Sequence, residues 1–220
     1  MLQDNMRLLT NNDTGPIVIY ITGKHEASHV DDLCRSVASQ ASSDFTMYEV
    51  MVEDWDSNLT PWPASGIFGG RDFAGEGVNQ LKLVEELIRR ELGESVISQR
   101  PLYIAGYSLA GLFSLWALCE SDIFAGAVSC SGSLWYPKWC QYIEGKSFLS
   151  DKKVYLSLGD KEPRTKNQVM STVGDCTTKT YEFLLKNVMV KNVHFEWNEG
   201  GHFTDPSKRM AKGIAWIIDN

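Results

Sequence analysis

The chain has 220 residues, of which 43% are hydrophobic, and a formal net charge of −7 at pH 7. This length and hydrophobic content are sufficient for one large domain with helices on both sides of a sheet, so we expect a single domain over residues 1–220. A net negative chain lacks the basic surface that nucleic acids and anionic membranes attract. Neither is therefore expected as a partner.

The cysteines are odd in number and form no Cys-x-x-Cys pair, which argues against a disulfide framework and against a cysteine-based zinc site. They are Cys34, Cys119, Cys130, Cys140 and Cys176. The first residues lack the basic start and apolar stretch of a signal peptide, and no apolar run approaches twenty residues. We therefore expect a cytoplasmic protein with reduced thiols and no membrane span.

The first half of the chain alternates strand and helix signals. The elements expected from apolar runs and helical periodicity are a strand at 16–22, a helix at 26–40, a strand at 45–52 and a helix at 78–92. Residues 55–77 are rich in Pro, Gly and aromatic residues and predict a long loop. Long loops of this kind often carry function.

The second half continues this alternation. The expected elements are a strand at 102–105, a helix from residue 109, a strand at 124–131, a short helix at 137–144, a strand at 153–158, a helical region ending within 180–188, a strand at 193–197 and a helix at 206–218. Strands separated by helices imply right-handed crossovers, a mainly parallel sheet and a three-layer α/β/α sandwich. Ligands of such sheets bind at the carboxyl ends of the strands.

Ser108 lies on the predicted corner between the strand at 102–105 and the following helix. Its neighbours Gly106 and Ala110 are small, as a tight strand-to-helix turn requires. An ordinary helix with a serine N-cap is the alternative. Residues 106–111 resemble the nucleophile elbow of α/β-hydrolases, Gly-x-Ser-x-Gly, with Ala110 in place of the second glycine and Gly111 one position later.

A serine nucleophile needs a histidine base and an acid that orients it. The resemblance implies the order Ser, acid, His. Of the four histidines, His202 alone follows the last predicted strand, in the glycine-flanked sequence 198–203, and we expect it to reach Ser108. The acid should follow the strand at 153–158, where Glu162 matches the family's spacing and Asp160 is the second candidate.

Two further segments resemble the serine esterase family that includes esterase-D-like and siderophore-esterase-like enzymes. Residues 124–135 contain the Ser-Gly-Ser-x-Trp run that follows the sheet in this family, and Gly-Gly-His precedes a terminal helix. The likeness extends from residue 16 to the C-terminus. It implies an α/β-hydrolase fold with reduced N-terminal strands and no separate cap domain, and hydrolysis of a small-molecule carboxylic ester without metal or organic cofactor. Thioester or amide cleavage stays open, since the same triad performs all three.

The resemblance also implies an oxyanion hole. The amide of Leu109 is expected to supply one donor, and the loop after the first strand, at Gly23 or Lys24, the other. Aromatic residues near strand ends predict the substrate pocket, although packing under a long loop explains each equally well. They are Trp55, Trp62, Trp135, Tyr136 and Trp139, to which we add Tyr107 beside the serine. Arg71 could bind a substrate carboxylate, but an exposed loop arginine is the simpler interpretation.

A competing motif is His25-Glu26-Ala27-Ser28-His29, which matches the His-Glu-x-x-His pattern of zinc hydrolases. That pattern requires one continuous helix over both histidines and a third ligand downstream. Here Gly23 lies two positions before the first histidine, and Glu49 or Glu53 would have to be the third ligand. A third hypothesis is a hydrolase-like scaffold kept as a non-catalytic binding module.

Overall fold

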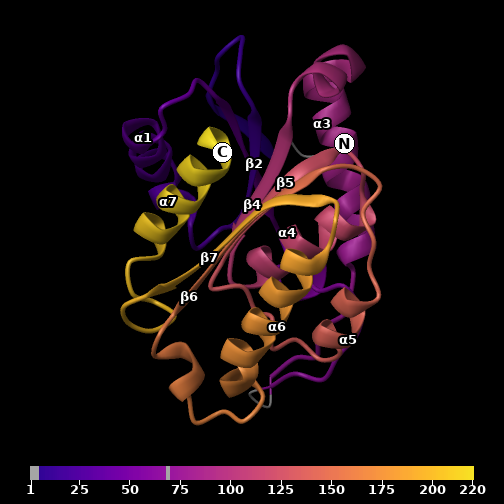
Figure 1. Cartoon of the computed structure of the whole chain (residues 1–220), viewed down its shortest axis with the longest axis vertical. Coiled ribbons are helices and arrows are strands. Elements are labelled where there is room, and N and C mark those ends of the chain that lie inside the picture. The colour runs from indigo at the N-terminus through magenta and orange to yellow at the C-terminus, as the bar shows by residue number, and fades with distance from the viewer. Residues whose placement is uncertain (1–4, 68–69) are drawn as a thin grey trace.

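The computed structural model describes residues 5–67 and 70–220, which form a seven-stranded sheet with helices on both faces (Figure 1). The strands are β1 (Met6–Thr10), β2 (Ile17–Gly23), β3 (Thr46–Val52), β4 (Leu102–Tyr107), β5 (Phe124–Cys130), β6 (Lys152–Gly159) and β7 (Val190–Asn198). Their order across the sheet is β1-β3-β2-β4-β5-β6-β7. Only β1 is antiparallel to its neighbour.

The helices divide into two layers. Helices α1 (Val30–Gln40) and α7 (Pro206–Asp219) pack on one face, where they share a core with the side chains of β2 and β4 that point to that side. The opposite face is covered by α3 (Gly77–Gln99), α4 (Leu109–Glu120), α5 (Trp139–Glu144) and α6 (Val173–Lys186). The predicted three-layer, mainly parallel α/β/α sandwich is confirmed.

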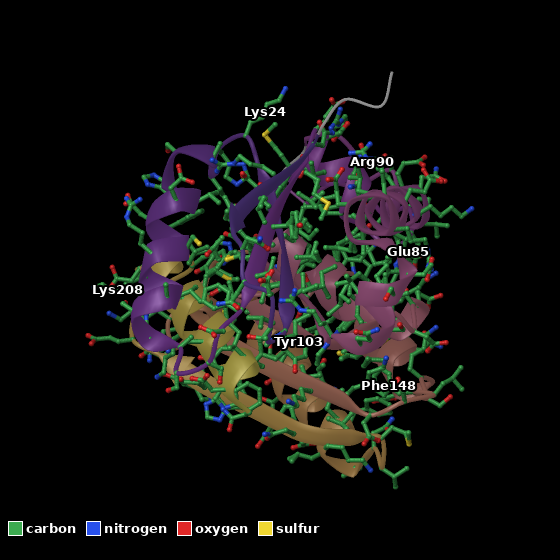
Figure 2. The ribbon with its side chains drawn as sticks, turned by 90° about the horizontal axis from the view of Figure 1, so that it is seen from above. Lys24, Glu85, Arg90, Tyr103, Phe148 and Lys208 are labelled. Carbon is green, nitrogen blue, oxygen red and sulfur yellow. The ribbon has the colours of Figure 1, made fainter. Side chains whose placement is uncertain are left out.

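The central strands are buried on both faces, which is why they read as continuous apolar runs. Every residue of β2 and of β4 is buried. Figure 2 looks at the molecule from above: Tyr103 lies among the side chains between the layers, whereas Lys24 and Lys208 project from the outside. Among the described residues, no helix combines the length and the apolar character needed to cross a membrane.

Some elements differ from the sequence-based expectation. The antiparallel strand β1 has no apolar run because its side chains are mostly half-buried or exposed at the sheet edge. A short helix, α2 (Trp55–Asn58), interrupts the predicted loop and is capped by the Asp54 side chain. Helix α3 continues beyond residue 92 across a kink at Gly93, whose φ of 73° lies in the left-handed region open to glycine.

The strand ends bring distant parts of the sequence together. Strand β4 ends one residue before Ser108, β6 ends three residues before Glu162, and β7 ends four residues before His202. Since these strands are parallel, the three segments emerge at the same edge of the sheet.

Candidate active site

Ser108 occupies the sharp corner between β4 and α4. Its φ of 56° and ψ of −122° lie outside the regions that L-residues normally adopt, so the backbone is strained at this position. A Cβ atom on Gly106 would lie 2.4 Å from backbone atoms of Ala110, which explains the small residue there. The Ser108 side chain makes no N-cap hydrogen bond, so the alternative of an ordinary helix cap is not what the structure shows.

His202 lies in the loop between β7 and α7 and reaches Ser108. Its Nε2 is 3.0 Å from Ser108 Oγ. Several hydrogen bonds hold the loop. Among them, the Tyr107 hydroxyl donates to the carbonyl of His202 at 2.6 Å, and the amide of Gly200 donates to Asp160 Oδ1 at 2.7 Å. These bonds fix the backbone that carries the imidazole.

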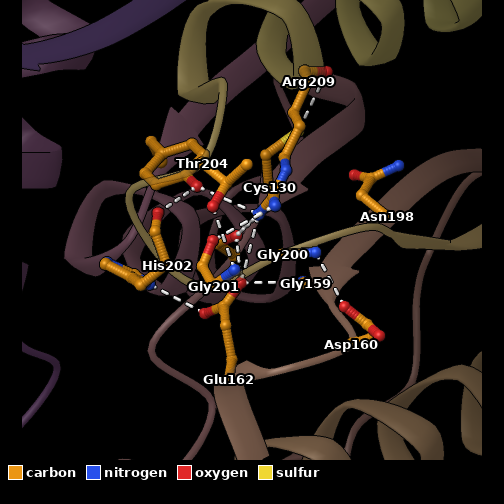
Figure 3. Close-up of polar contacts among 12 residues, drawn as sticks. Cys130, Gly159, Asp160, Glu162, Asn198, Gly200, Gly201, His202, Thr204 and Arg209 are labelled. Carbon is orange, nitrogen blue, oxygen red and sulfur yellow. Dashed lines mark hydrogen bonds and ion pairs between the residues drawn. The ribbon is translucent and has the colours of Figure 1, made fainter.

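The structure places Glu162, and not Asp160, against the imidazole (Figure 3). Glu162 Oε2 lies 2.8 Å from His202 Nδ1, whereas the Asp160 carboxylate binds the Gly200 amide. Because an ionised carboxylate can only accept, Nδ1 carries the proton and Nε2 is left to accept the Ser108 hydroxyl. The two carboxylates therefore have different partners in the same turn.

The environment of Glu162 favours its charged form. Burial by itself raises the pKa of this carboxyl, but hydrogen bonds from His202, from the Ser131 hydroxyl at 2.6 Å and from the Gly159 amide at 2.7 Å outweigh it, and the net pKa is lowered. The Arg209 guanidinium lies 3.3 Å from Glu162 Oε1. Glu162 therefore presents a negative charge to the imidazole.

Sequence reasoning missed two of these supporting residues. Arg209, on α7, is only 5% exposed and also donates to Ser131, to Tyr107 and to the carbonyls of 199 and 201. The sequence did carry one signal, since Arg209 is a positive charge on the apolar side of the last helix. A buried guanidinium is costly without an anionic partner, so its position indicates that such a partner lies nearby. Ser131 lies in the run quoted for the family resemblance, but its bond to Glu162 depends on a residue 31 positions away.

Of the two backbone amides expected to form the oxyanion hole, one has no acceptor within its helix and the other already donates a hydrogen bond. Leu109 is the first residue of α4, so its amide has no acceptor within the helix and lies beside Ser108. The amide of Gly23 donates instead to Glu26 Oε2 at 3.3 Å. Gly23 therefore does not stand as an open donor toward Ser108 in this structure.

Two cavities meet at Ser108 and His202. We call the first, of about 450 Å³, the Glu26 pocket; its wall consists of Tyr20, His25, Glu26, His29, Val30, Leu33, Trp55, Tyr107, Ser108, His202, Phe203, Pro206, Ser207 and Met210. The second, of about 390 Å³, is the Arg71 pocket, lined by Trp55, Asp56, Gly66, Ile67, Gly70, Arg71, Phe73, Ser108, Leu109, Ser133, Trp135, Met170, His202 and Phe203. Ser108 and His202 can thus face two separate parts of one ligand.

Comparison with solved structures identifies the architecture. The siderophore hydrolase EstA from Aspergillus nidulans matches with a TM-score of 0.70 and 16% identity, covering 97% of this chain and 94% of that one. An IroE-like serine hydrolase from Shewanella oneidensis matches with a TM-score of 0.70 and 17% identity, covering 97% of this chain and 74% of that one. The enterobactin and salmochelin hydrolase IroE matches with a TM-score of 0.64 and 18% identity, covering 96% of this chain and 85% of that one. The chain has the α/β-hydrolase fold. No family model matches the sequence, and neither does any curated protein.

The predicted pocket aromatics fall in different places of this fold. Trp135 lines the Arg71 pocket and Tyr107 the Glu26 pocket, while Trp55 lines both. Trp62 lines neither cavity, because it packs on aromatic neighbours and donates through Nε1 to the carbonyl of residue 137 at 2.9 Å. Trp139, which is fully buried, bonds to Thr180 and lines neither.

The remaining two predicted binding residues, Tyr136 and Arg71, already have partners within the protein. Tyr136 is buried and donates to the carbonyl of residue 62 at 2.6 Å. Arg71 lines its pocket but pairs with Asp54 at 2.6 Å and has a 65% exposed side chain. Its guanidinium is therefore partly engaged before any ligand arrives.

The His-Glu-x-x-His string does not form the helix that zinc hydrolases need. Residues 24–26 form a turn, Ala27–His29 is one turn of 3-10 helix, and α1 begins only at Val30. Over residues 5–67 and 70–220, no group of three or more His, Cys, Asp or Glu side chains could hold a metal ion. His25, Glu26 and His29 lie instead along the Glu26 pocket.

Proposed function

We propose that this protein is a serine esterase that cleaves a small-molecule carboxylic ester through an acyl-enzyme intermediate. Ser108 is the nucleophile, His202 the general base and then the general acid, and Glu162 the residue that orients the imidazole. The observation that carries the proposal is the chain of contacts from Ser108 Oγ to His202 at 3.0 Å and from His202 to Glu162 at 2.8 Å, at the junction of two cavities.

The steps follow from these contacts. Ser108 Oγ attacks the ester carbonyl as its proton passes to His202 Nε2, and the resulting imidazolium is stabilised by the Glu162 carboxylate. The oxygen that becomes negative receives the Leu109 N–H; losing one such donor typically costs about 3 kcal/mol in the barrier. His202 then protonates the leaving alcohol, and a water molecule, activated by the same imidazole, releases the acid and restores Ser108.

The fold is one in which this chemistry occurs. The three similar structures named above are described as a siderophore hydrolase, an IroE-like serine hydrolase, and an enterobactin and salmochelin hydrolase. The strained backbone at Ser108 also supports the proposal, because such strain persists where a function requires the side chain to be lifted from the sheet.

A fluorophosphonate probe tests the proposal directly. We expect the wild-type protein to be labelled covalently and to hydrolyse p-nitrophenyl acetate, and Ser108→Ala to lose both. Ser133→Ala is the matched control, since the Ser133 hydroxyl lies 3.4 Å from Ser108 Oγ and lines the same cavity but has no imidazole partner; it should still be labelled. Labelling that persists in Ser108→Ala, or a wild type that neither reacts nor hydrolyses any ester, contradicts the proposal and favours a binding module.

A chelator separates the serine mechanism from a metal mechanism. Activity should persist in the presence of EDTA and in a His29→Ala variant. Loss of activity in both would favour a metal ion held by the segment 25–29.

A further inference from the structure

The Glu26 pocket contains a carboxyl group that the proposed mechanism does not use. Glu26 follows the end of β2, in the turn where its own amide donates to the Gly23 carbonyl at 3.0 Å. Its side chain folds back so that Oε2 accepts the Gly23 amide. This reciprocal bonding fixes the carboxyl group in the wall of a cavity that also contains Ser108 and His202.

The other oxygen of this carboxyl is free to receive a ligand. Glu26 Oε1 has a single contact, the Tyr20 hydroxyl at a long 3.5 Å. Burial raises the pKa of the Glu26 carboxyl to about 7, against weaker opposing effects of the Gly23 and Tyr20 bonds. Among residues 5–67 and 70–220, no cationic side chain forms an ion pair with this carboxyl.

The rest of the wall is suited to a positive charge. Aromatic side chains contribute from four segments, namely Tyr20, Trp55, Tyr107 and Phe203. None of the described residues that line the pocket is Lys or Arg. Lys24, two positions from Glu26, is exposed and projects from the surface (Figure 2). The Phe203 ring, which is 88% exposed, is accessible to a ligand in this pocket.

We propose that the Glu26 pocket is a subsite for an ammonium group on the ester substrate, with Glu26 as a specificity-determining residue. The inference rests on the proposed esterase function and names the substrate class of that site. An ammonium ion beside Glu26 supplies the missing countercharge and lies among aromatic faces, whose quadrupoles attract cations. A neutral carbon isostere of the same shape gains the apolar contacts alone.

Several titratable groups face Glu26 and bear on its pH dependence. His25 and His29 come from its own segment, Tyr20 from β2, Tyr107 from β4 and His202 from the loop before α7. Glu49 of β3 also raises the Glu26 pKa through its charge. The preference for cationic esters should grow from about pH 6 to about pH 8, because Glu26 becomes ionised over this range.

Matched pairs of esters test the proposal without assuming which side of the scissile bond enters the pocket. One pair is acetylcholine and 3,3-dimethylbutyl acetate; the other is the p-nitrophenyl esters of 4-(trimethylammonio)butanoate and 5,5-dimethylhexanoate. We expect the wild type to favour the cation in at least one pair, and Glu26→Gln, which keeps an oxygen for the Gly23 amide, to lower that kcat/KM ratio about tenfold. Glu53→Gln removes a nearby exposed carboxylate outside the pocket and should keep the wild-type ratio.

A binding measurement separates this inference from the proposed function. In a Ser108→Ala background, NMR titration should show choline binding more tightly than 3,3-dimethyl-1-butanol, and Glu26→Gln should remove the difference. Equal affinities for the two compounds, or a cation preference unchanged by Glu26→Gln, overturn the ammonium subsite even where ester hydrolysis through Ser108 is present. A cation preference in binding without any hydrolysis supports the subsite and removes the esterase.

Discussion

Arg209 and Glu162 form a buried ion pair behind the imidazole, with Nη1 of the guanidinium 3.3 Å from Oε1 of the carboxylate. Both side chains are at most 5% exposed, so each charge depends on the other and on hydrogen bonds for its solvation. The second nitrogen of Arg209 donates to the carbonyls of residues 199 and 201, both at 3.1 Å. One residue of α7 therefore supports both the acid and the histidine loop.

Replacing Arg209 should destabilise the protein strongly. Arg209→Met leaves Glu162 without its cationic partner and two carbonyls without a donor, and breaking a buried pair by removing one partner typically costs about 3 kcal/mol or more. Denaturant unfolding measures this cost. Lys208→Met is the control on the same helix, since its side chain is 81% exposed and its pairing with Asp205 is a surface contact that should change stability by less than about 1 kcal/mol. Equal changes in the free energy of unfolding for the two substitutions would show that the buried contacts of Arg209 do not stabilise the protein.

Separate substitutions of the two competing carboxylates should give unequal losses of activity. Glu162→Gln removes the charge that stabilises the imidazolium and can present an N–H to Nδ1, so kcat should fall about 10³-fold or more with little change in KM. Asp160→Asn keeps an oxygen for the Gly200 amide and should lower kcat by less than about tenfold. Steady-state kinetics on one chromogenic ester decide between them; a larger loss in Asp160→Asn would reverse the assignment of the acid.

The predictable part of the fold is the part whose side chains are buried on both faces of the sheet. Strands β2 and β4 read as continuous apolar runs because helices cover both sides. Strand β1 has no such pattern, since an edge strand with exposed side chains carries only a weak signal in the sequence. Helix α2 is not predicted because it is short and depends on one local cap, and it lies within the segment that predicts a loop.

The proximity of three candidate site residues was predictable from the sequence, but most of their supporting contacts were not. The positions of Ser108, Glu162 and His202 follow from strand order, because parallel strands end at one edge. The contacts of Arg209 do not, since they join α7 to the last residue of β4, to the residue after β5 and to the segment after β6 through bonds that no local pattern encodes. The same holds for Glu26, which the sequence presented as part of a metal motif and the structure places in a pocket wall.

The two glycines before His202 should respond differently to alanine. Gly200 has a φ of 101°, and a Cβ there would lie 2.5 Å from the Thr204 hydroxyl, so Gly200→Ala must shift the loop. A small displacement of His202, the proposed general base, should lower kcat by about tenfold to a hundredfold. A Cβ on Gly201 meets nothing within 4 Å, and Gly201→Ala should retain near-wild-type kcat. Kinetics with both variants, and thermal unfolding to confirm folding, check this; similar kcat values for the two would mean that the loop is not strained at Gly200.

The stability of the protein should depend on pH through Glu26. The pKa of this carboxyl is about 7 in the folded chain and close to 4.5 in the unfolded chain, so the folded state binds its proton more tightly. The contribution of Glu26 is therefore fully present below about pH 4.5 and is lost as the pH rises through about 7. Glu26→Gln cannot titrate, and its free energy of unfolding should rise relative to the wild type by about 2 kcal/mol between pH 5 and pH 8.

Denaturant unfolding at the two pH values measures this difference, and the exposed Glu53→Gln should show no comparable change. Because all other titratable groups are shared, the comparison isolates Glu26. A choline-type cation that binds at Glu26 should reduce the difference at pH 8, since the paired carboxylate no longer costs folding free energy. If Glu26→Gln follows the wild type across the whole range, the carboxyl is already solvated or paired, and the ammonium subsite loses its electrostatic basis.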